Sequence, residues 1–202
     1  MKSLPEVLAE AQRLGFLGPG PVDRHLTHAA GFVRCLPAGE FACLDLGSGG
    51  GVPGLVLAER CPGGRFVLLD SGRRRCRFLR QAVSALELTG RVEVVEARAE
   101  DAARLADLRG THDVVVARSF GPPAVTAECA VAFLRPGGLL VVSEPPEPPA
   151  GERWPAGGLA ALGFAPPAPC GDATARFVTL VRERLDDRWP RRVGIPAKRP
   201  LW

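Results

Sequence analysis

The sequence lacks the features that mark membrane and secreted proteins. No stretch of apolar residues approaches the ~20 that a membrane-spanning helix needs. The first residues, MKSLPEVLAEAQRLG, include acids and no continuous apolar region, so a secretory signal peptide is not expected. We therefore expect a cytoplasmic protein with no membrane partner.

The cysteines form no C-x-x-C pair, and their spacing is typical of neither a zinc site nor a small disulfide scaffold. Most of them lie in apolar stretches, where a reduced cysteine behaves as a small hydrophobic residue. We therefore expect no metal site and no disulfide framework. The cysteines are Cys35, Cys43, Cys61, Cys76, Cys129 and Cys170.

Lysine is scarce, since only Lys2 and Lys198 occur, and tyrosine is absent. Arginine therefore carries nearly all of the positive charge, within an Ala/Arg/Gly/Pro bias that we attribute mainly to GC-rich coding. With 202 residues, of which 46% are hydrophobic and 24% charged, the chain has an ordinary globular composition. The length suits one compact domain with a sizeable core. The composition excludes wholesale disorder and a coiled coil.

The net charge of +4 is unevenly distributed. Residues 182–202 contain seven basic and three acidic side chains, so this tail alone carries a net charge equal to that of the whole chain. A second cluster of arginines lies between residues 73 and 80. Such patches suit a phosphate backbone, and the alternative is a solvated helix face and a soluble tail.

Strands and helices alternate with short links through most of the chain, which is typical of a parallel sheet covered on both faces. Two short helices, 4–14 and 22–36, precede the first strand, and a late strand at 175–184 predicts a terminal antiparallel hairpin. Short apolar runs predict the other strands at 41–46, 65–70, 92–97, 112–117 and 139–143. Helical spacing predicts helices at 73–88, 101–108 and 125–134.

The most informative motif is LDLGSGGGVPG at residues 44–54, where a strand enters glycines and a helix begins at Pro53. The G-x-G-x-x-G expression of dinucleotide-binding folds matches residues 49–54, but it starts too late, because the strand ends at Leu46. An acid in the strand followed by G-x-G-x-G is instead the pattern of S-adenosylmethionine (AdoMet) methyltransferases. A plain glycine-rich turn is the alternative reading.

Asp45 and the glycine loop suit the amino-acid end of AdoMet, which carries an amino group and a carboxylate. The Asp45 carboxylate suits the ammonium, directly or through water. Free N–H groups at the start of the following helix suit the carboxylate.

Polar residues also follow the next three predicted strands, whose carboxyl ends form the ligand crevice of such a fold. Asp70 is placed to accept hydrogen bonds from ribose hydroxyls, and Glu100 lies where adenine would bind. Arg118 ends the fourth strand, where an arginine is better placed for binding than for packing. The alternatives are that Asp70-Ser71 caps a helix and that Glu100-Asp101 are acids of a first helical turn.

At these residues the sequence resembles the RsmG (GidB) family, bacterial methyltransferases that act on N7 of a guanine in small-subunit ribosomal RNA. The Gly-Val-Pro-Gly continuation and the Asp-Ser before the basic helix are more specific than the general methyltransferase motif. The resemblance implies a Rossmann-like class I fold with a mostly parallel seven-stranded sheet and a terminal antiparallel hairpin. It runs from Arg24 to Arg199, most clearly in LDLGSGGGVPGLVL (44–57), LDSGRRRCRFL (69–79), ARAED (97–101), VARSF (116–120) and WPRRVGIPAKRPL (189–201).

The resemblance also implies AdoMet as the cofactor, ribosomal RNA or the small ribosomal subunit as the partner, and Arg118 as the catalytic residue. For His25, a helix-packing histidine is the alternative to an RNA contact. The predicted cofactor-binding residues are Gly47, Ser48, Gly49, Gly51, Val52, Asp70, Ser71, Ala99, Glu100 and Arg118. The predicted RNA-binding residues are Arg24, His25, Phe120, Arg191, Arg192 and Arg199.

We predict an N-terminal helical segment packed on the core (1–38), an AdoMet-binding methyltransferase domain (39–184) and a basic C-terminal tail (185–202). Two departures lie on the expected RNA side. Family members usually carry a longer N-terminal region, and they usually have Lys-Gly where this chain has Ser143-Glu144-Pro145.

Three functions are compatible with the sequence. In an RNA methyltransferase, guanine N7 carries no proton, so no general base is required and catalysis is mainly positioning. In a small-molecule methyltransferase, the Pro/Gly-rich loop 144–158 would be a lid over a buried, mostly apolar pocket. The third function is a non-catalytic RNA- or ribosome-binding module.

Overall fold

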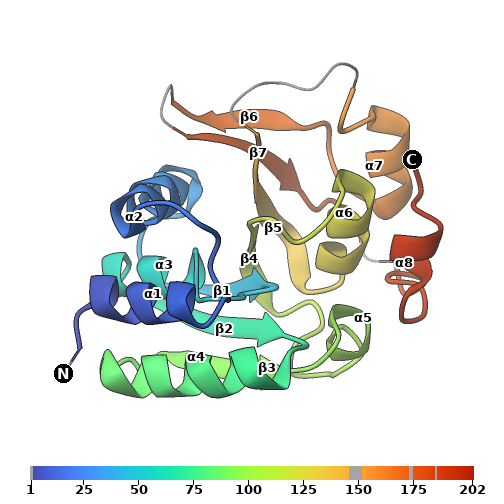
Figure 1. Ribbon diagram of the computed structural model, residues 1–202. Coiled ribbons are helices and arrows are strands. Elements are labelled where there is room, and N and C mark those ends of the chain that lie inside the picture. The colour runs from blue at the N-terminus through green and yellow to red at the C-terminus, as the bar shows by residue number, and fades with distance from the viewer. Residues whose placement is uncertain (1, 146–151, 173–174, 185) are drawn as a thin grey trace.

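The computed structural model describes residues 2–145, 152–172, 175–184 and 186–202. Its centre is a single twisted sheet with helices on both faces (Figure 1). The strands are β1 (Phe41–Leu46), β2 (Gly64–Asp70), β3 (Val92–Glu96), β4 (His112–Ala117), β5 (Leu134–Ser143), β6 (Ala168–Gly171) and β7 (Arg176–Val181). The helices are α1 (Leu4–Arg13), α2 (Val22–Gly31), the 3-10 helix η1 (Phe32–Cys35), α3 (Gly54–Arg60), α4 (Arg73–Ala85), α5 (Ala99–Ala102), α6 (Pro123–Val131), α7 (Ala156–Leu162) and α8 (Ile195–Lys198).

The seven strands lie in the order β3-β2-β1-β4-β5-β7-β6. Strands β1 to β5 pair in parallel, and β7 runs antiparallel to both of its neighbours, β5 and β6. The predicted α/β fold, with a mostly parallel seven-stranded sheet and a terminal antiparallel hairpin, is therefore confirmed. Because parallel strands end at the same edge, the segments that follow β1 to β4 meet there.

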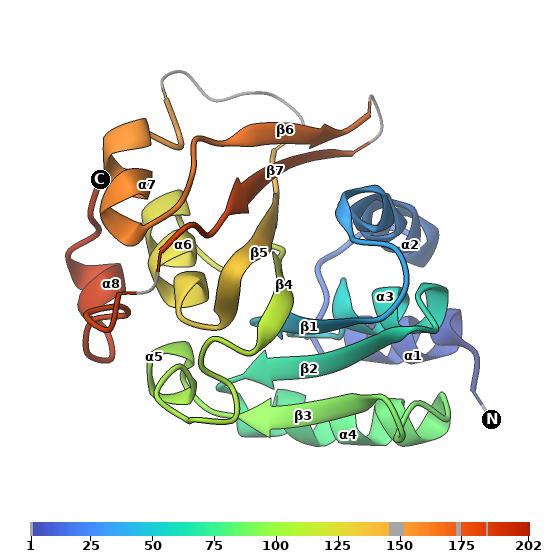
Figure 2. The same ribbon diagram turned by 180° about the vertical axis from the view of Figure 1, so that it is seen from behind.

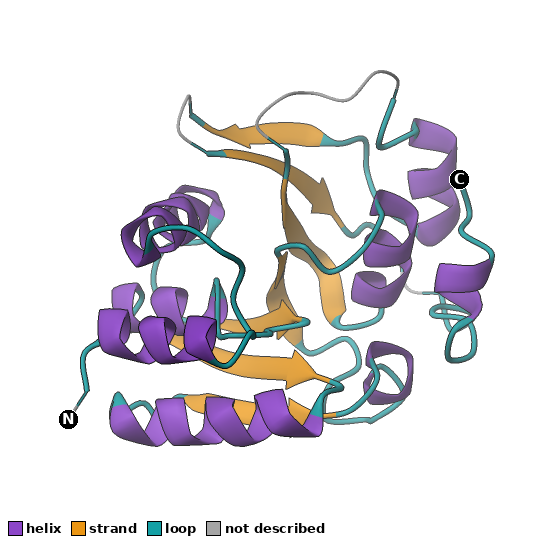
Figure 3. Ribbon diagram, in the orientation of Figure 1, coloured by secondary structure: helices purple, strands orange, loops and turns teal. Residues whose placement is uncertain are grey.

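Two apolar layers hold the helices on the sheet (Figure 3). In β1 the side chain of Cys43 points into one layer and that of Leu44 into the other, as the period of two in a strand requires. The first layer buries α1, α3 and α4, together with parts of α2 and η1, and the second buries α5, α6 and α7. Both faces of the central strands are thus apolar.

Several predicted bounds differ from the structure. The helix expected at 101–108 is α5, which begins at Ala99 and ends at Ala102, because the following N–H groups bond to carbonyls three residues back, as Leu105 does to Ala102. The helix expected at 22–36 ends at Gly31 and continues as a 3-10 turn. Strand β6 and helix α8 were not among the predicted elements.

The prediction of no disulfide is wrong for one pair of cysteines. Cys35, at the end of η1, is joined to Cys170 in β6, with their Cα atoms 6.2 Å apart. The two residues are 135 positions apart in the sequence, so no local spacing pattern could indicate the bond. The other four cysteines are free, as expected.

Among the described residues, no helix is long and apolar enough to cross a membrane.

Candidate cofactor cavity and active site

The loop between β1 and α3 has a backbone that favours glycine. Gly47, Gly49 and Gly51 have φ values of +75°, +55° and +92°, in the left-handed region that other residues rarely adopt. A Cβ atom on Gly47 would lie 2.6 Å from Cδ2 of the Phe120 ring, so a larger residue cannot stand there without a shift. The glycines thus allow the loop backbone to lie close to the Phe120 ring at the edge of the sheet.

The N–H groups of this loop bond mainly within the protein. Those of Gly47 and Ser48 donate to the Leu69 carbonyl at 2.9 and 3.0 Å, which ties the loop to the end of β2. At the start of α3, the Gly54 N–H donates to Oδ2 of Asp45 at 3.0 Å. The expectation that this helix start offers its N–H groups to a cofactor carboxylate is therefore wrong at Gly54.

Asp45 lies beneath the loop and is 1% exposed. Its Oδ2 atom accepts the Gly54 N–H, whereas Oδ1 has no hydrogen-bond partner among the described residues. Burial raises the pKa of Asp45 to about 7, against the lowering effect of the hydrogen bond from Gly54. Asp45 thus holds a buried acceptor atom without a partner among the described residues, and its predicted contact with an ammonium group stays a prediction.

A cavity of about 450 Å³ lies at the carboxyl ends of β1 to β4. It brings together many of the predicted cofactor residues, namely Gly47, Gly49, Asp70, Ser71, Ala99 and Glu100, and also Phe120. Ser48, Gly51 and Val52 are packed in the loop behind it and are not part of its lining. Its size and its lining by the four strand ends are typical of a pocket for a small organic molecule.

Asp70 is held rigidly at one side of this cavity. Its Oδ1 atom accepts the Gly72 N–H at 2.7 Å and the Arg75 Nε–H at 2.8 Å. Its Oδ2 atom accepts the Gly49 N–H at 2.9 Å. Since a carboxylate oxygen has two lone pairs, Oδ2 can accept a further hydrogen bond from a ribose hydroxyl. Asp70 can thus accept N–H groups at the start of α4 and a ribose hydroxyl at the same time.

Glu100 connects the cavity to the C-terminal tail. It is 3% exposed, and its Oε1 atom accepts the Gly194 N–H at 2.9 Å. Ala197, three residues further on, lines the cavity itself. On the opposite side of the lining, Gly15 and Phe16 come from the segment between α1 and α2. No sequence signal indicated that residues near both ends of the chain border the site.

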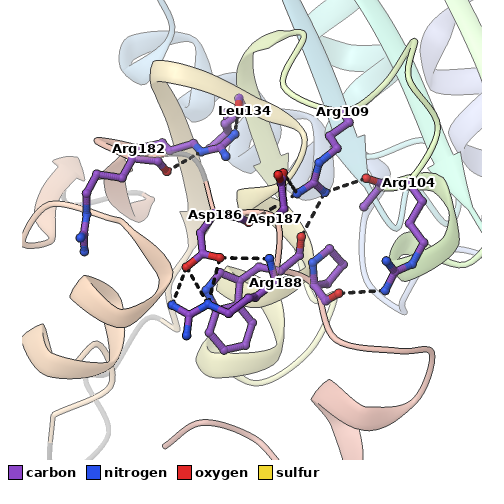
Figure 4. A network of polar contacts seen from close by, with 11 residues as sticks. Arg104, Arg109, Leu134, Arg182, Asp186, Asp187 and Arg188 are labelled. Atoms are coloured by element: carbon purple, nitrogen blue, oxygen red, sulfur yellow. Dashed lines mark hydrogen bonds and ion pairs between the residues drawn. The ribbon is translucent and has the colours of Figure 1, made fainter.

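Arginines hold the tail through its backbone (Figure 4). The Arg109 guanidinium donates to the Trp189 carbonyl at 3.0 Å, and that of Arg104 donates to the Pro190 carbonyl at 3.1 Å. Arg188 is paired with Asp186 at 2.6 Å, and this hydrogen bonding lowers the pKa of Asp186 to about 2. The tail is therefore fixed along α5 and α6 rather than hanging free.

Arg191 was predicted to bind RNA phosphates, and the structure gives its guanidinium a partner inside the protein. It donates to both carboxylate oxygens of Glu128, at 2.8 and 2.6 Å, and Glu128 is completely buried. A buried carboxylate needs such a partner. We therefore do not propose Arg191 as an RNA contact. Arg192 and Arg199 of the same tail are exposed.

Arg118, the predicted catalytic residue, is not part of the cavity lining. Its side chain points to the side of the sheet that carries α2, where its Nη2–H group lies 2.8 Å from Nδ1 of His25. The next residue, Ser119, has a φ of +57° and lines the cavity, as does Phe120. A non-glycine residue in this conformation is uncommon and often marks a functional site.

His25, predicted to contact RNA, is 9% exposed and is held by the protein. Its neighbour Arg24, by contrast, is exposed. His28 and His112, interpreted as structural from the sequence, are paired with aromatic rings. Burial and the charge of Arg118 lower the pKa of His28 to about 4, so this ring is neutral near pH 7.

Glu144, which stands where the family usually has lysine, is paired within the protein. Its carboxylate accepts hydrogen bonds from Nε of Arg153 at 2.9 Å and from Nε1 of Trp154 at 3.1 Å. The predicted lid at 144–158 includes residues 146–151, which lie outside the described residues. Among the described residues, no group of three or more His, Cys, Asp or Glu side chains is placed to hold a metal ion.

Comparisons with known proteins identify the family of this chain. Residues 21–144 match the GidB family, described as rRNA small subunit methyltransferase G. The chain is 37% identical to the ribosomal RNA small subunit methyltransferase G of Rubrobacter xylanophilus, over 96% of this chain and 80% of that protein. It is 36% identical to the protein of that name from Deinococcus deserti, over 89% and 78% of the two chains.

Solved structures with low sequence identity share the fold. A candidate AdoMet-dependent methyltransferase of Methanococcus maripaludis superposes with a TM-score of 0.63 at 12% identity, over 91% of this chain and 94% of that one. A precorrin-6y C5,15-methyltransferase of Geobacter metallireducens superposes with a TM-score of 0.54 at 16% identity, over 77% and 87%. The family model and the two relatives at 36% and 37% identity show that the chain belongs to the rRNA small subunit methyltransferase G family.

Proposed function

We propose that this protein transfers a methyl group from AdoMet to N7 of a guanine in small-subunit ribosomal RNA, in the cytoplasm. The observation that carries the proposal is the cavity at the ends of β1 to β4, bordered by the glycine loop, Asp70 and Glu100. Family membership supports the substrate class. The alternatives from the sequence, a small-molecule acceptor and a non-catalytic module, are outcomes of the test below.

The residues at the cavity fit AdoMet. Asp45 is not part of the cavity lining, but its buried carboxylate oxygen Oδ1 has no partner among the described residues and suits the ammonium of the amino-acid end through a water. Asp70 has acceptor capacity for a ribose hydroxyl, and the Ala99-Glu100 segment borders the end where adenine would lie. When bound, the cofactor supplies an electrophilic methyl group.

Positioning is the main task of the protein in this reaction, because guanine N7 is a nucleophile that carries no proton. Phe120 offers a ring at the cavity on which a base can stack. Arg118 has a guanidinium N–H, at Nη1, with no partner among the described residues. This donor is buried outside the cavity lining, so we assign to Arg118 the support of the cavity wall formed by Ser119 and Phe120.

Exposed arginines surround the cavity and suit an RNA backbone. Arg75 of α4 lines the cavity, and Arg73 and Arg77 lie on the exposed face of the same helix. The exposed Arg192 and Arg199 come from the tail. Such contacts supply affinity that does not depend on base sequence and that weakens with salt.

The test is methyl transfer from labelled AdoMet to small-subunit RNA, naked or in the ribosomal particle, that lacks its N7-methylguanine, preceded by calorimetry of AdoMet binding. Wild-type protein is expected to bind AdoMet and label one guanine. Arg118→Ala is expected to lose most turnover while its unfolding midpoint stays near that of the wild type. Full turnover in this variant would contradict the role of Arg118, and AdoMet binding without transfer to RNA would contradict the proposed substrate.

A further inference from the structure

The ring of His25 makes two polar contacts inside the protein. Its Nε2 atom lies 3.1 Å from the Gly18 carbonyl, and its Nδ1 atom lies 2.8 Å from Nη2 of Arg118. A carbonyl only accepts and a guanidinium only donates. Nε2 must therefore carry the proton and Nδ1 must be an acceptor, which defines a single neutral tautomer.

The hydrogen-bond geometry of the ring fits this tautomer. The Arg118 guanidinium donates to Nδ1, which can accept only while that nitrogen carries no proton. His28, one helical turn further along α2, is neutral near pH 7, because burial and the charge of Arg118 lower its pKa. Burial lowers the pKa of Arg118, and the charge of Asp45 opposes this effect. A buried imidazole with both nitrogens engaged is poorly suited to bind an RNA phosphate.

The contact holds one end of the guanidinium. Nη2 is engaged by His25, whereas Nη1 is buried and has no partner among the described residues. His25 is therefore the hydrogen-bond partner that fixes the Arg118 guanidinium, and through it the residue that precedes Ser119 and Phe120 of the cavity lining. Without the His25 acceptor, the long arginine side chain would have a second unpaired nitrogen and other conformations to adopt.

We propose that His25 is a positioning residue, which holds Arg118 through Nδ1 and thereby fixes the end of β4, where the next two residues, Ser119 and Phe120, line the cavity. The inference rests on the proposed function for the role of Arg118 in methyl transfer. It differs from the assignment of His25 to RNA phosphates, since it predicts a loss of turnover rather than a loss of RNA affinity.

Two variants separate the possibilities. His25→Leu removes the acceptor, whereas in His25→Asn the amide oxygen stands near the position of Nδ1. We expect kcat to fall ~10- to 100-fold in His25→Leu, with the KM values for RNA and AdoMet within about threefold of wild type. His25→Asn is expected to recover most of the lost kcat. A phosphate contact would instead raise the KM for RNA and make its salt dependence shallower, as expected for Arg24→Ala.

A second measurement does not depend on activity. Nitrogen NMR of the His25 ring is expected to show the neutral form protonated at Nε2 near pH 7, and Arg118→Met is expected to shift the Nδ1 resonance. A charged ring, or an Nδ1 resonance that Arg118→Met leaves unchanged, would overturn the positioning role. Absence of methyl transfer by the wild-type protein would overturn the proposed function alone.

Discussion

The two ends of the chain both border the cavity, but they are held there by different forces. Near the N-terminus, α1 buries Leu4, Val7, Leu8 and Ala11 in the first apolar layer, and Phe16 follows as part of the cavity lining. Near the C-terminus, Trp189, Leu201 and Trp202 pack at the margin of the second layer, and hydrogen bonds and ion pairs to the backbone and to Arg191 hold the tail as well. The support of one wall is therefore apolar, whereas that of the other includes a buried polar component.

This difference indicates how each wall responds to change. Apolar burial tolerates altered charge but not lost volume. A polar support tolerates small changes of volume but not the loss of one partner, since the other is then left buried and unpaired. Loss of one charged partner should consequently loosen the tail more than it loosens α1.

The largest effect should follow loss of the partner of Glu128. Arg191→Ala leaves a fully buried carboxylate without its ion pair, and we expect a loss of about 3 to 5 kcal/mol in the free energy of unfolding. Urea unfolding measures this loss, and hydrogen exchange should show the Gly194 amide losing protection. AdoMet affinity should fall as well. Arg192→Ala, an exposed neighbour, is the matched control, and equal effects of the two changes would refute a polar support.

The apolar wall is tested by a cavity in α1. Leu8 is completely buried, and Leu8→Ala should lower the free energy of unfolding by about 2 to 4 kcal/mol. Hydrogen exchange should then increase in α1 and leave Gly194 protected. If the tail amides lost protection equally, the two walls would form one cooperative unit, and the contrast drawn above would not hold.

Asp45 lies beneath the glycine loop, and its titration makes the free energy of unfolding depend on pH. Its folded pKa of about 7 lies above its usual value of 3.8, so the folded state binds the proton more tightly. Wild-type stability should therefore fall as pH rises from about 4 to about 7, and Asp45→Asn should lack this loss. The difference between the two unfolding free energies should change by about 2 to 4 kcal/mol over that range. Parallel pH profiles would show that Asp45 titrates normally.

The smallest effect on stability is expected for the exposed cations that each terminal segment carries. Arg24→Ala and Arg199→Ala should each change the free energy of unfolding by less than about 0.5 kcal/mol. Each should also reduce the salt dependence of RNA binding by about one counterion. Filter binding over a range of salt concentrations measures this slope. A slope equal to that of wild type would remove the residue concerned from the RNA-facing surface.

Much of the sheet edge could be predicted from the sequence. The apolar run before the glycines predicted β1 with its observed bounds, and the alternation of strands and helices predicted where Asp70, Glu100 and Arg118 would emerge. These inferences work because hydrophobic period and turn residues are local signals. The same signals were weaker at α5, where a single turn of helix gives way to tighter turns.

The contacts that join distant segments could not be predicted. Nothing in the period of α2 indicates that His25 reaches Arg118, which lies 93 residues further along the chain. Likewise, the basic composition of the tail suggested RNA binding for Arg191, whereas the buried Glu128 of α6 is its partner. Such pairs depend on the three-dimensional approach of two elements, each of which looks ordinary alone.

The bond between Cys35 and Cys170 gives the molecule a covalent ring. The ring encloses β1 to β5 and the helices α3 to α7, while α1, α2, β7 and the tail lie on the two free arms. Figure 2 shows α1 and α2 on one side of the molecule and α8 on the opposite side. A single peptide-bond cut anywhere inside the ring would leave the two fragments as one covalent molecule, and only a reductant would separate them. While the bond is intact, the parallel strands β1 to β5 thus lie within one closed covalent loop. The segments that border the cavity near the two ends of the chain lie outside that loop.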